Sequence, residues 1–156
     1  MGSIRVLIVD DAVVVRRMLS DIISSDPLLT VVGTAANGKI ALKKIPTLKP
    51  DVVILDMDMP EMNGLETLER IRKTQARLPV IAFSTQTMRG AKVTLEALSK
   101  GATDYVTKPS SRTGGRSALE TIREELIPKI KIFVRRTGSA ALVKQPIRYK
   151  PLPPGT

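Results

Sequence analysis

The chain has 156 residues, of which 42% are apolar, and this is enough for one globular domain with a buried core. It contains no cysteine and no histidine, which excludes disulfides, zinc–thiolate sites and a Ser-His-Asp triad within the chain. No apolar run approaches the roughly 20 residues that span a bilayer, and no signal peptide is visible, so we expect a cytoplasmic protein with no membrane partner.

The net charge of +10 is unevenly distributed along the chain. Residues 1–110 carry 15 Lys and Arg against 12 Asp and Glu, whereas residues 111–156 carry 10 against 3. The basic excess therefore lies in the C-terminal part and not on the body of the domain. Tryptophan is absent and Phe and Tyr are few, so aromatic platforms for stacked bases are lacking as well. These features argue against a nucleic-acid partner.

The first half of the chain alternates between apolar runs and segments with helical periodicity. Residues 4–9 and 28–35 are typical of buried strands. The helix expected between them has one apolar face, formed by Val14, Met18, Ile22 and Ile23. Asn37 is placed to cap a second helix, which we expect over residues 38–46 and to end at Pro46. The inward residues of that second helix are Ile40, Ala41 and Ile45.

The second half continues the alternation. The remaining expected strands are residues 52–55, 79–83 and 104–107. A tight loop at Asn63-Gly64 precedes the third helix, and Thr87 is placed to cap the fourth. The apolar residues of these two helices are Leu65, Leu68, Ile71, Ala91, Leu95 and Leu98. A last helix is expected from about residue 117 to 133, with a kink at Pro128. Its apolar residues are Leu119, Ile122, Leu126, Ile130 and Phe133.

Five strand–helix units of this length predict an α/β fold with a doubly wound parallel sheet and helices on both faces. In such sheets ligands bind beyond the carboxyl ends of the strands. The polar residues at those ends are Asp10, Asp11, Asp56, Ser84 and Lys108. Carboxylate and hydroxyl oxygens without His or Cys predict a hard cation such as Mg²⁺. One carboxylate is then left to act as a nucleophile toward a phosphoryl group, with Lys108 and Ser84 contacting its oxygens.

The motifs that carry these residues resemble the response-regulator receiver domain over about residues 4–134. They are Ile8-Val9-Asp10-Asp11, the run from Asp56 to Gly64, Ser84-Thr85 and Lys108-Pro109. The resemblance implies a flavodoxin-like strand order 2-1-3-4-5 with five helices, and a receiver spanning residues 1–136. It also implies that Asp56 accepts a phosphoryl group from a sensor histidine kinase, with Ser84 and Lys108 assisting.

The same resemblance implies a metal site and a switch. The Mg²⁺ ligands would be Asp10, Asp11, Asp56 and the backbone carbonyl of Asp58. Ser84 and Tyr105 would form the switch, in which the hydroxyl moves toward the phosphoryl group and the ring turns inward. Without the resemblance, Tyr105 would be interpreted as an ordinary half-buried strand residue, and this alternative stays open here.

Residues 92–98, 101–110 and 124–130 are similar to the receiver of the chemotaxis protein-glutamate methylesterase. The similarity implies an esterase domain controlled by the receiver, but its Ser-His-Asp triad requires a histidine that this chain lacks. We therefore expect residues 137–156 to be a Pro-rich basic linker or tail, with the esterase outside the chain. The output face would lie on the fourth helix and fifth strand, near Thr87, Arg89 and Lys92, with Met88 packed at the core edge.

Three alternative functions compete with this interpretation. A stand-alone receiver that signals by binding another protein also predicts phosphorylation, and a downstream esterase sequence would separate the two. A DNA-binding regulator is disfavoured because the tail from Thr137 is short and rich in proline. An aspartyl-phosphate hydrolase is disfavoured because the Asp56-Met57-Asp58 spacing follows the third strand and not the first.

Overall fold

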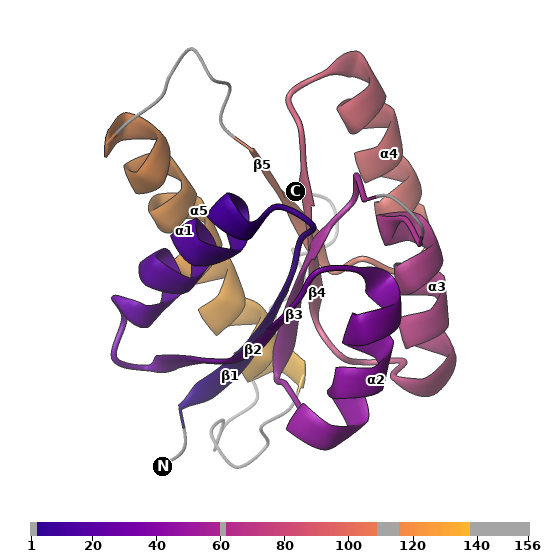
Figure 1. Ribbon diagram of the computed structural model, residues 1–156, viewed down its shortest axis with the longest axis horizontal. Helices are drawn as coiled ribbons and strands as arrows, with labels where there is room; N and C mark the ends of the chain where they lie inside the picture. The colour runs from indigo at the N-terminus through magenta and orange to yellow at the C-terminus, as the bar shows by residue number, and fades with distance from the viewer. Residues whose placement is uncertain (1–2, 60–61, 109–115, 138–156) are drawn as a thin grey trace, which may run out of the picture.

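The computed structural model describes residues 3–59, 62–108 and 116–137, and its elements are shown in Figure 1. The strands are β1 (Ile4–Val9), β2 (Leu29–Ala35), β3 (Val52–Asp56), β4 (Val80–Ser84) and β5 (Asp104–Thr107). The helices are α1 (Val13–Ser24), α2 (Gly38–Leu48), α3 (Gly64–Thr74), α4 (Met88–Ser99) and α5 (Arg116–Thr137). All strand pairs are parallel, in the order β2-β1-β3-β4-β5, so the predicted fold class is confirmed.

The sheet is covered by helices on both faces (Figure 1). Alternate strand residues feed two separate apolar layers, as the two-residue period of a strand requires. Val6 and Ile8 of β1 pack with α1 and α5, whereas Leu7 and Val9 pack with α2, α3 and α4. Strands that are buried on both faces must be apolar throughout, which is why the chain is so rich in Val, Ile and Leu between residues 4 and 9.

Helix starts follow local hydrogen-bonding chemistry. Asn37 accepts a hydrogen bond from the Ile40 backbone N–H at 2.9 Å, and Thr87 accepts one from Gly90 at 2.8 Å, as predicted. Asn63 caps α3 in the same way. None of the helices in the described part of the chain is both long and apolar enough to cross a membrane.

Two predicted helix boundaries were wrong. Helix α2 does not end at Pro46 but continues to Leu48. The fixed φ of proline is compatible with a helix, and its missing N–H removes only one intrahelical hydrogen bond. The helix stops at Lys49, whose positive φ of 48° and backbone bond to the Ile45 carbonyl close the last turn. Helix α5 runs to Thr137, past the expected end at residue 133, and continues through Pro128.

Several residues predicted on inward faces are exposed. Val14 is 74% exposed because α1 packs on the sheet through its later turns, at Leu19, Ile22 and Ile23. Met88 is 90% exposed, so its predicted packing at the core edge was wrong. The other exposed members of the predicted faces are Ile40, Ala91, Leu95, Leu98 and Leu119. The predicted tail beyond Thr137 and the motif residues Pro60, Glu61 and Pro109 lie outside the described residues.

Gly64, the first residue of α3, packs closely against the backbone at the end of β3. A Cβ there would lie 2.6 Å from the Asp56 carbonyl oxygen and 2.5 Å from the Met57 Cα. Because both neighbours are backbone atoms, we expect Gly64→Ala to lower the free energy of unfolding by about 2 kcal/mol, measured by urea denaturation. Gly33→Ala is the control, since its nearest neighbour is the movable end of the Leu48 side chain. Equal losses in the two variants would contradict this account.

Candidate functional site

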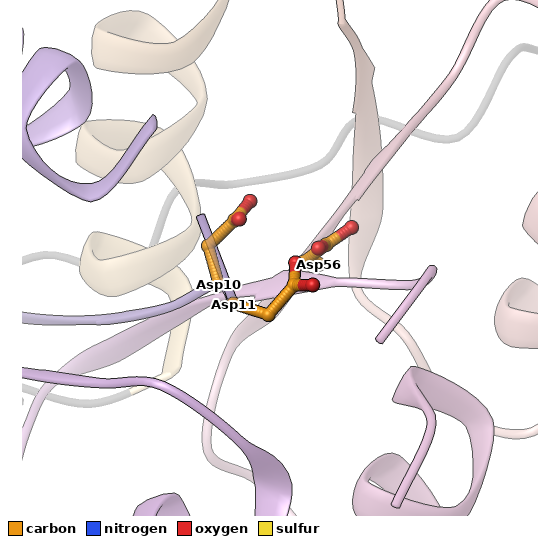
Figure 2. A group of neighbouring side chains, drawn as sticks. All are labelled: Asp10, Asp11 and Asp56. Atoms are coloured by element: carbon orange, nitrogen blue, oxygen red, sulfur yellow. The ribbon is translucent and has the colours of Figure 1, made fainter. Parts of the chain in front are cut away.

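Three carboxylates meet where β1 and β3 end. Asp10 follows β1 and Asp56 is the last residue of β3, and the two strands are hydrogen-bonded neighbours. One ligand oxygen from each of Asp10, Asp11 and Asp56 lies within 4.8 Å of the others. Figure 2 shows the three side chains beside one another. Asp10 and Asp56 are buried and Asp11 is exposed, so the cluster is open to solvent on one side.

Lys108 brings a positive charge to this cluster from the far edge of the sheet. Its backbone N–H donates to the Ser84 carbonyl at 2.7 Å, which fixes the start of the side chain beside β4. Its ammonium donates to Asp56 Oδ1 at 2.9 Å and lies 3.5 Å from Asp10 Oδ2. The side chain crosses the Phe83 ring, with Nζ 5.4 Å from the ring centre. One lysine is therefore shared between two buried carboxylates.

Each buried carboxylate accepts its hydrogen bonds through one oxygen, Oδ1. Asp10 Oδ1 accepts from the Ala12 backbone at 2.9 Å, and Asp56 Oδ1 accepts from the Asp58 backbone at 3.0 Å. Both Oδ2 atoms are buried and accept no hydrogen bond within the described part of the chain. Asp10 Oδ2 forms the ion pair with Lys108. Asp56 Oδ2 accepts no hydrogen bond from the described residues, and the Lys108 ion pair of Asp56 is made by Oδ1. Buried oxygens of this kind are costly unless something binds them, so the donor set fits a hard cation.

Burial dominates the titration of the site. It raises the pKa of Asp56 to about 7, and the nearby Asp10 charge adds to the rise, while the Lys108 hydrogen bond opposes it. Burial likewise raises the pKa of Asp10, against the hydrogen bond from Ala12. Burial alone would lower the pKa of Lys108, but the two carboxylates outweigh it and the pKa is raised. The lysine is thus charged, and its single charge does not fully compensate two carboxylates.

Ser84 lies at the end of β4 but its hydroxyl is bound elsewhere. The Ser84 Oγ is 2.6 Å from Thr94 Oγ1 of α4, and both residues are buried. Thr94 Oγ1 in turn donates to the Gly90 carbonyl at 2.8 Å. Thr94 was not singled out from the sequence as a site residue. The signal in the sequence was a hydroxyl residue four positions after a glycine, on the inward side of a helix that also buries Ala97.

The sequence matches the family model of the response regulator receiver domain over residues 6–124, well over half of the chain. The chain belongs to the response regulator receiver domain family. The receiver is 42% identical to the response regulator domain of Thermotoga maritima CheB, with a TM-score of 0.75, covering 85% of this chain and 96% of that one. A putative response regulator from Chloroflexus aurantiacus is 27% identical, with a TM-score of 0.71 over 86% of this chain and 100% of that one.

The curated relatives that this chain matches are longer proteins. A protein-glutamate methylesterase/protein-glutamine glutaminase of Trichodesmium erythraeum is 54% identical over 139 residues, which are 89% of this chain and 40% of that protein. One of the same name from a Nocardioides species is 51% identical and is covered over 38% of its length. The chain thus spans about two fifths of the length of the curated relatives it matches.

The second expected switch residue, Tyr105, is turned outward on β5 of the receiver. It is 41% exposed, and the Lys129 ammonium of α5 lies 5.0 Å from the centre of its ring. The same ammonium donates to the Tyr105 carbonyl at 2.6 Å and pairs with Asp104 at 3.6 Å. Sequence reasoning did not single out Lys129, because no local pattern connects a helix lysine to a strand 24 residues earlier.

The raised pKa of Asp56 predicts how the metal-free receiver responds to pH. A carboxyl whose pKa is higher in the folded than in the unfolded protein contributes stability at low pH, and this is lost as the pH rises from about 4 to about 7. Asn cannot ionise, so we expect the stability of Asp56→Asn relative to wild type to rise with pH, by about 4 kcal/mol at pH 8.

The measurement is urea unfolding of both proteins in EDTA at pH 5 and pH 8. The exposed Asp58→Asn is the control, because it removes the same charge two residues away without relieving a buried one. A gain for Asp56→Asn that is equal at both pH values would show that burial of the charge is not the cause.

Proposed function

We propose that this receiver accepts a phosphoryl group on Asp56 from the phosphohistidine of a chemotaxis-type sensor kinase. The observation that carries the proposal is the state of the Asp56 carboxylate. Its Oδ1 is held by Lys108 and the Asp58 backbone, whereas its Oδ2 accepts no hydrogen bond within the described residues. A carboxylate that is fixed through one oxygen and uncommitted at the other is suited to nucleophilic attack.

In the transfer, an Asp56 oxygen forms a bond to phosphorus while the bond between phosphorus and the donor's imidazole nitrogen breaks. The imidazole leaves with the electron pair, and the product is a mixed carboxylic–phosphoric anhydride. Lys108, already within hydrogen-bond distance of Asp56, would contact the incoming phosphoryl oxygens and offset their charge. Asp56 must be ionised to attack, so burial sets its reactivity near neutral pH.

Mg²⁺ is the metal proposed for the cluster. Asp10, Asp11 and Asp56 would supply carboxylate oxygens, and the backbone carbonyl of Asp58 a further ligand. The buried Asp10 Oδ2 supports this assignment, because it accepts no hydrogen bond within the described residues and has only the ion pair with Lys108 at 3.5 Å. When bound, the ion would supply the positive charge that one lysine does not provide to two carboxylates and a phosphoryl group.

The proposed output is control of a protein-glutamate methylesterase domain attached to the receiver in a longer protein. Four large apolar side chains on α4 and β5 are exposed and support a binding face there. They are Met88, Leu95, Leu98 and Tyr105. A hollow beside this face is lined by Ser84 and Tyr105, the two expected switch residues, so a change at the acceptor could alter the face directly.

Asp56→Asn tests the acceptor. We expect it to abolish labelling by acetyl phosphate with Mg²⁺, because the amide is not a nucleophile at this site, whereas wild type gains the mass of one phosphoryl group. Intact mass spectrometry measures both. Asp58→Asn is the control and should still be labelled, since its side chain is exposed and its backbone is unchanged. Stoichiometric labelling of Asp56→Asn would overturn the proposal.

Asp11→Ala tests the metal site. Because Asp11 is exposed, its loss leaves the buried pair in place, and we expect Mg²⁺ affinity to fall about tenfold or more in calorimetric titration. Asp21→Ala makes the same charge change at an exposed position of α1 and should leave the affinity near that of wild type. An unchanged titration for Asp11→Ala would place the metal elsewhere.

A further inference from the structure

A short chain of hydroxyls connects the end of β4 to helix α4. Ser84 Oγ lies 2.6 Å from Thr94 Oγ1, which lies 2.8 Å from the Gly90 carbonyl. Ser84 is 3% exposed and Thr94 is 7% exposed, so water does not readily replace either bond.

The direction of these bonds follows from proton counting. A carbonyl cannot donate, so the single hydroxyl proton of Thr94 goes to Gly90. Thr94 can therefore only accept from Ser84, and the single hydroxyl proton of Ser84 is directed at α4. While this bond lasts, Ser84 has no proton to offer an oxygen in the aspartate crevice.

We propose that Thr94 is a positioning residue that holds the Ser84 hydroxyl away from the acceptor site until Asp56 is phosphorylated. The inference rests on the proposed function and adds the group that opposes the switch. Phosphorylation would exchange the neutral Ser84–Thr94 bond for a charge-assisted bond from Ser84 to a phosphoryl oxygen, which is roughly twice as strong.

The exchange leaves no buried donor unsatisfied. When Ser84 departs, Thr94 still donates to Gly90 and loses only an accepted bond, which is the less costly loss. A neutral hydrogen bond of this kind shifts the equilibrium between the two positions of the Ser84 hydroxyl by roughly fivefold. This is enough to favour the position at Thr94 and small enough for phosphorylation to reverse it.

Helix α4 is in a position to sense the exchange. A Cβ on Gly90 would collide with the Thr85 carbonyl oxygen and lie 2.7 Å from the Thr85 hydroxyl. The first turn of α4 therefore sits directly on the residue after Ser84. A rotation of Ser84 that removes its bond to Thr94 acts on the same helix that carries the exposed Met88 and Leu95.

The competing explanation is that Thr94 only satisfies a helix carbonyl, as buried threonines commonly do. Thr67 provides a matched control for this, because it is fully buried in α3 and donates to the Asn63 carbonyl at 2.9 Å. It makes the same bond four residues back, but it lies on another helix, and the Ser84 hydroxyl is bound to Thr94 instead.

The experiment measures how tightly the 156-residue chain binds beryllofluoride with Mg²⁺, by calorimetry. Beryllofluoride is a phosphoryl mimic that does not turn over. We expect Thr94→Val to bind it about fivefold more tightly than wild type, because the unphosphorylated state loses the partner of Ser84. Thr94→Ser should restore the wild-type affinity, and Thr67→Val should leave it unchanged while lowering stability.

The decisive comparison repeats Thr94→Val in a Ser84→Ala background, where the gain should disappear. If Thr94→Val does not fold, Thr94→Ala removes the same hydroxyl and takes its place. A wild-type affinity in Thr94→Val and Thr94→Ala overturns the inference and leaves the acceptor proposal intact. So does a gain in affinity that persists in the Ser84→Ala background. Absence of beryllofluoride binding by the wild-type chain overturns both.

Discussion

Two carboxylates buried at neighbouring strand ends, sharing one lysine, are the constraint on which this structure depends. Asp10 and Asp56 are adjacent because β1 and β3 are paired, and the Lys108 ammonium reaches them because β5 pairs with β4 and directs its side chain across Phe83. The lysine does not fully balance the charge of the two carboxylates, since the pKa of Asp56 is raised to about 7 even with the Lys108 ammonium at 2.9 Å. The site is thus arranged to favour the arrival of further positive charge.

Such a site lowers stability, and the remainder of the sheet compensates for it. The central strands are apolar on both faces, and their alternate residues fill two layers, one with α1 and α5 and the other with α2, α3 and α4. Polar groups are concentrated at the carboxyl ends of the strands. The cost of the buried charges is therefore borne by a core that is independent of them, as expected where function requires an unfavourable local arrangement.

The sequence allowed much of this to be predicted because the relevant rules are local. Parallel strands with polar residues at their carboxyl ends predict convergence of Asp10, Asp56 and Lys108 without knowledge of any contact. The errors arose where tertiary context decides. Val14 continues an apolar stripe that α1 does not bury, and Pro46 remains within a helix it was expected to end. Thr94 could not be assigned from the sequence, because its importance lies in the distance to Ser84 across the sheet–helix boundary.

The strengths of the contacts around the site indicate which of them would break first when Asp56 gains a phosphoryl group. The carboxylates are held by a charged lysine and by backbone donors, which are strong and buried. Ser84 is held by a neutral hydroxyl, and the exposed Tyr105 ring by a cation–π contact worth about 0.5–1 kcal/mol at such positions. A charge added at Asp56 would therefore reorganise the two weakly held side chains before it disturbed the pocket. Because Ser84 and Tyr105 line the hollow beside the exposed face of α4 and β5, these two weakly held side chains lie between the acceptor and the proposed output.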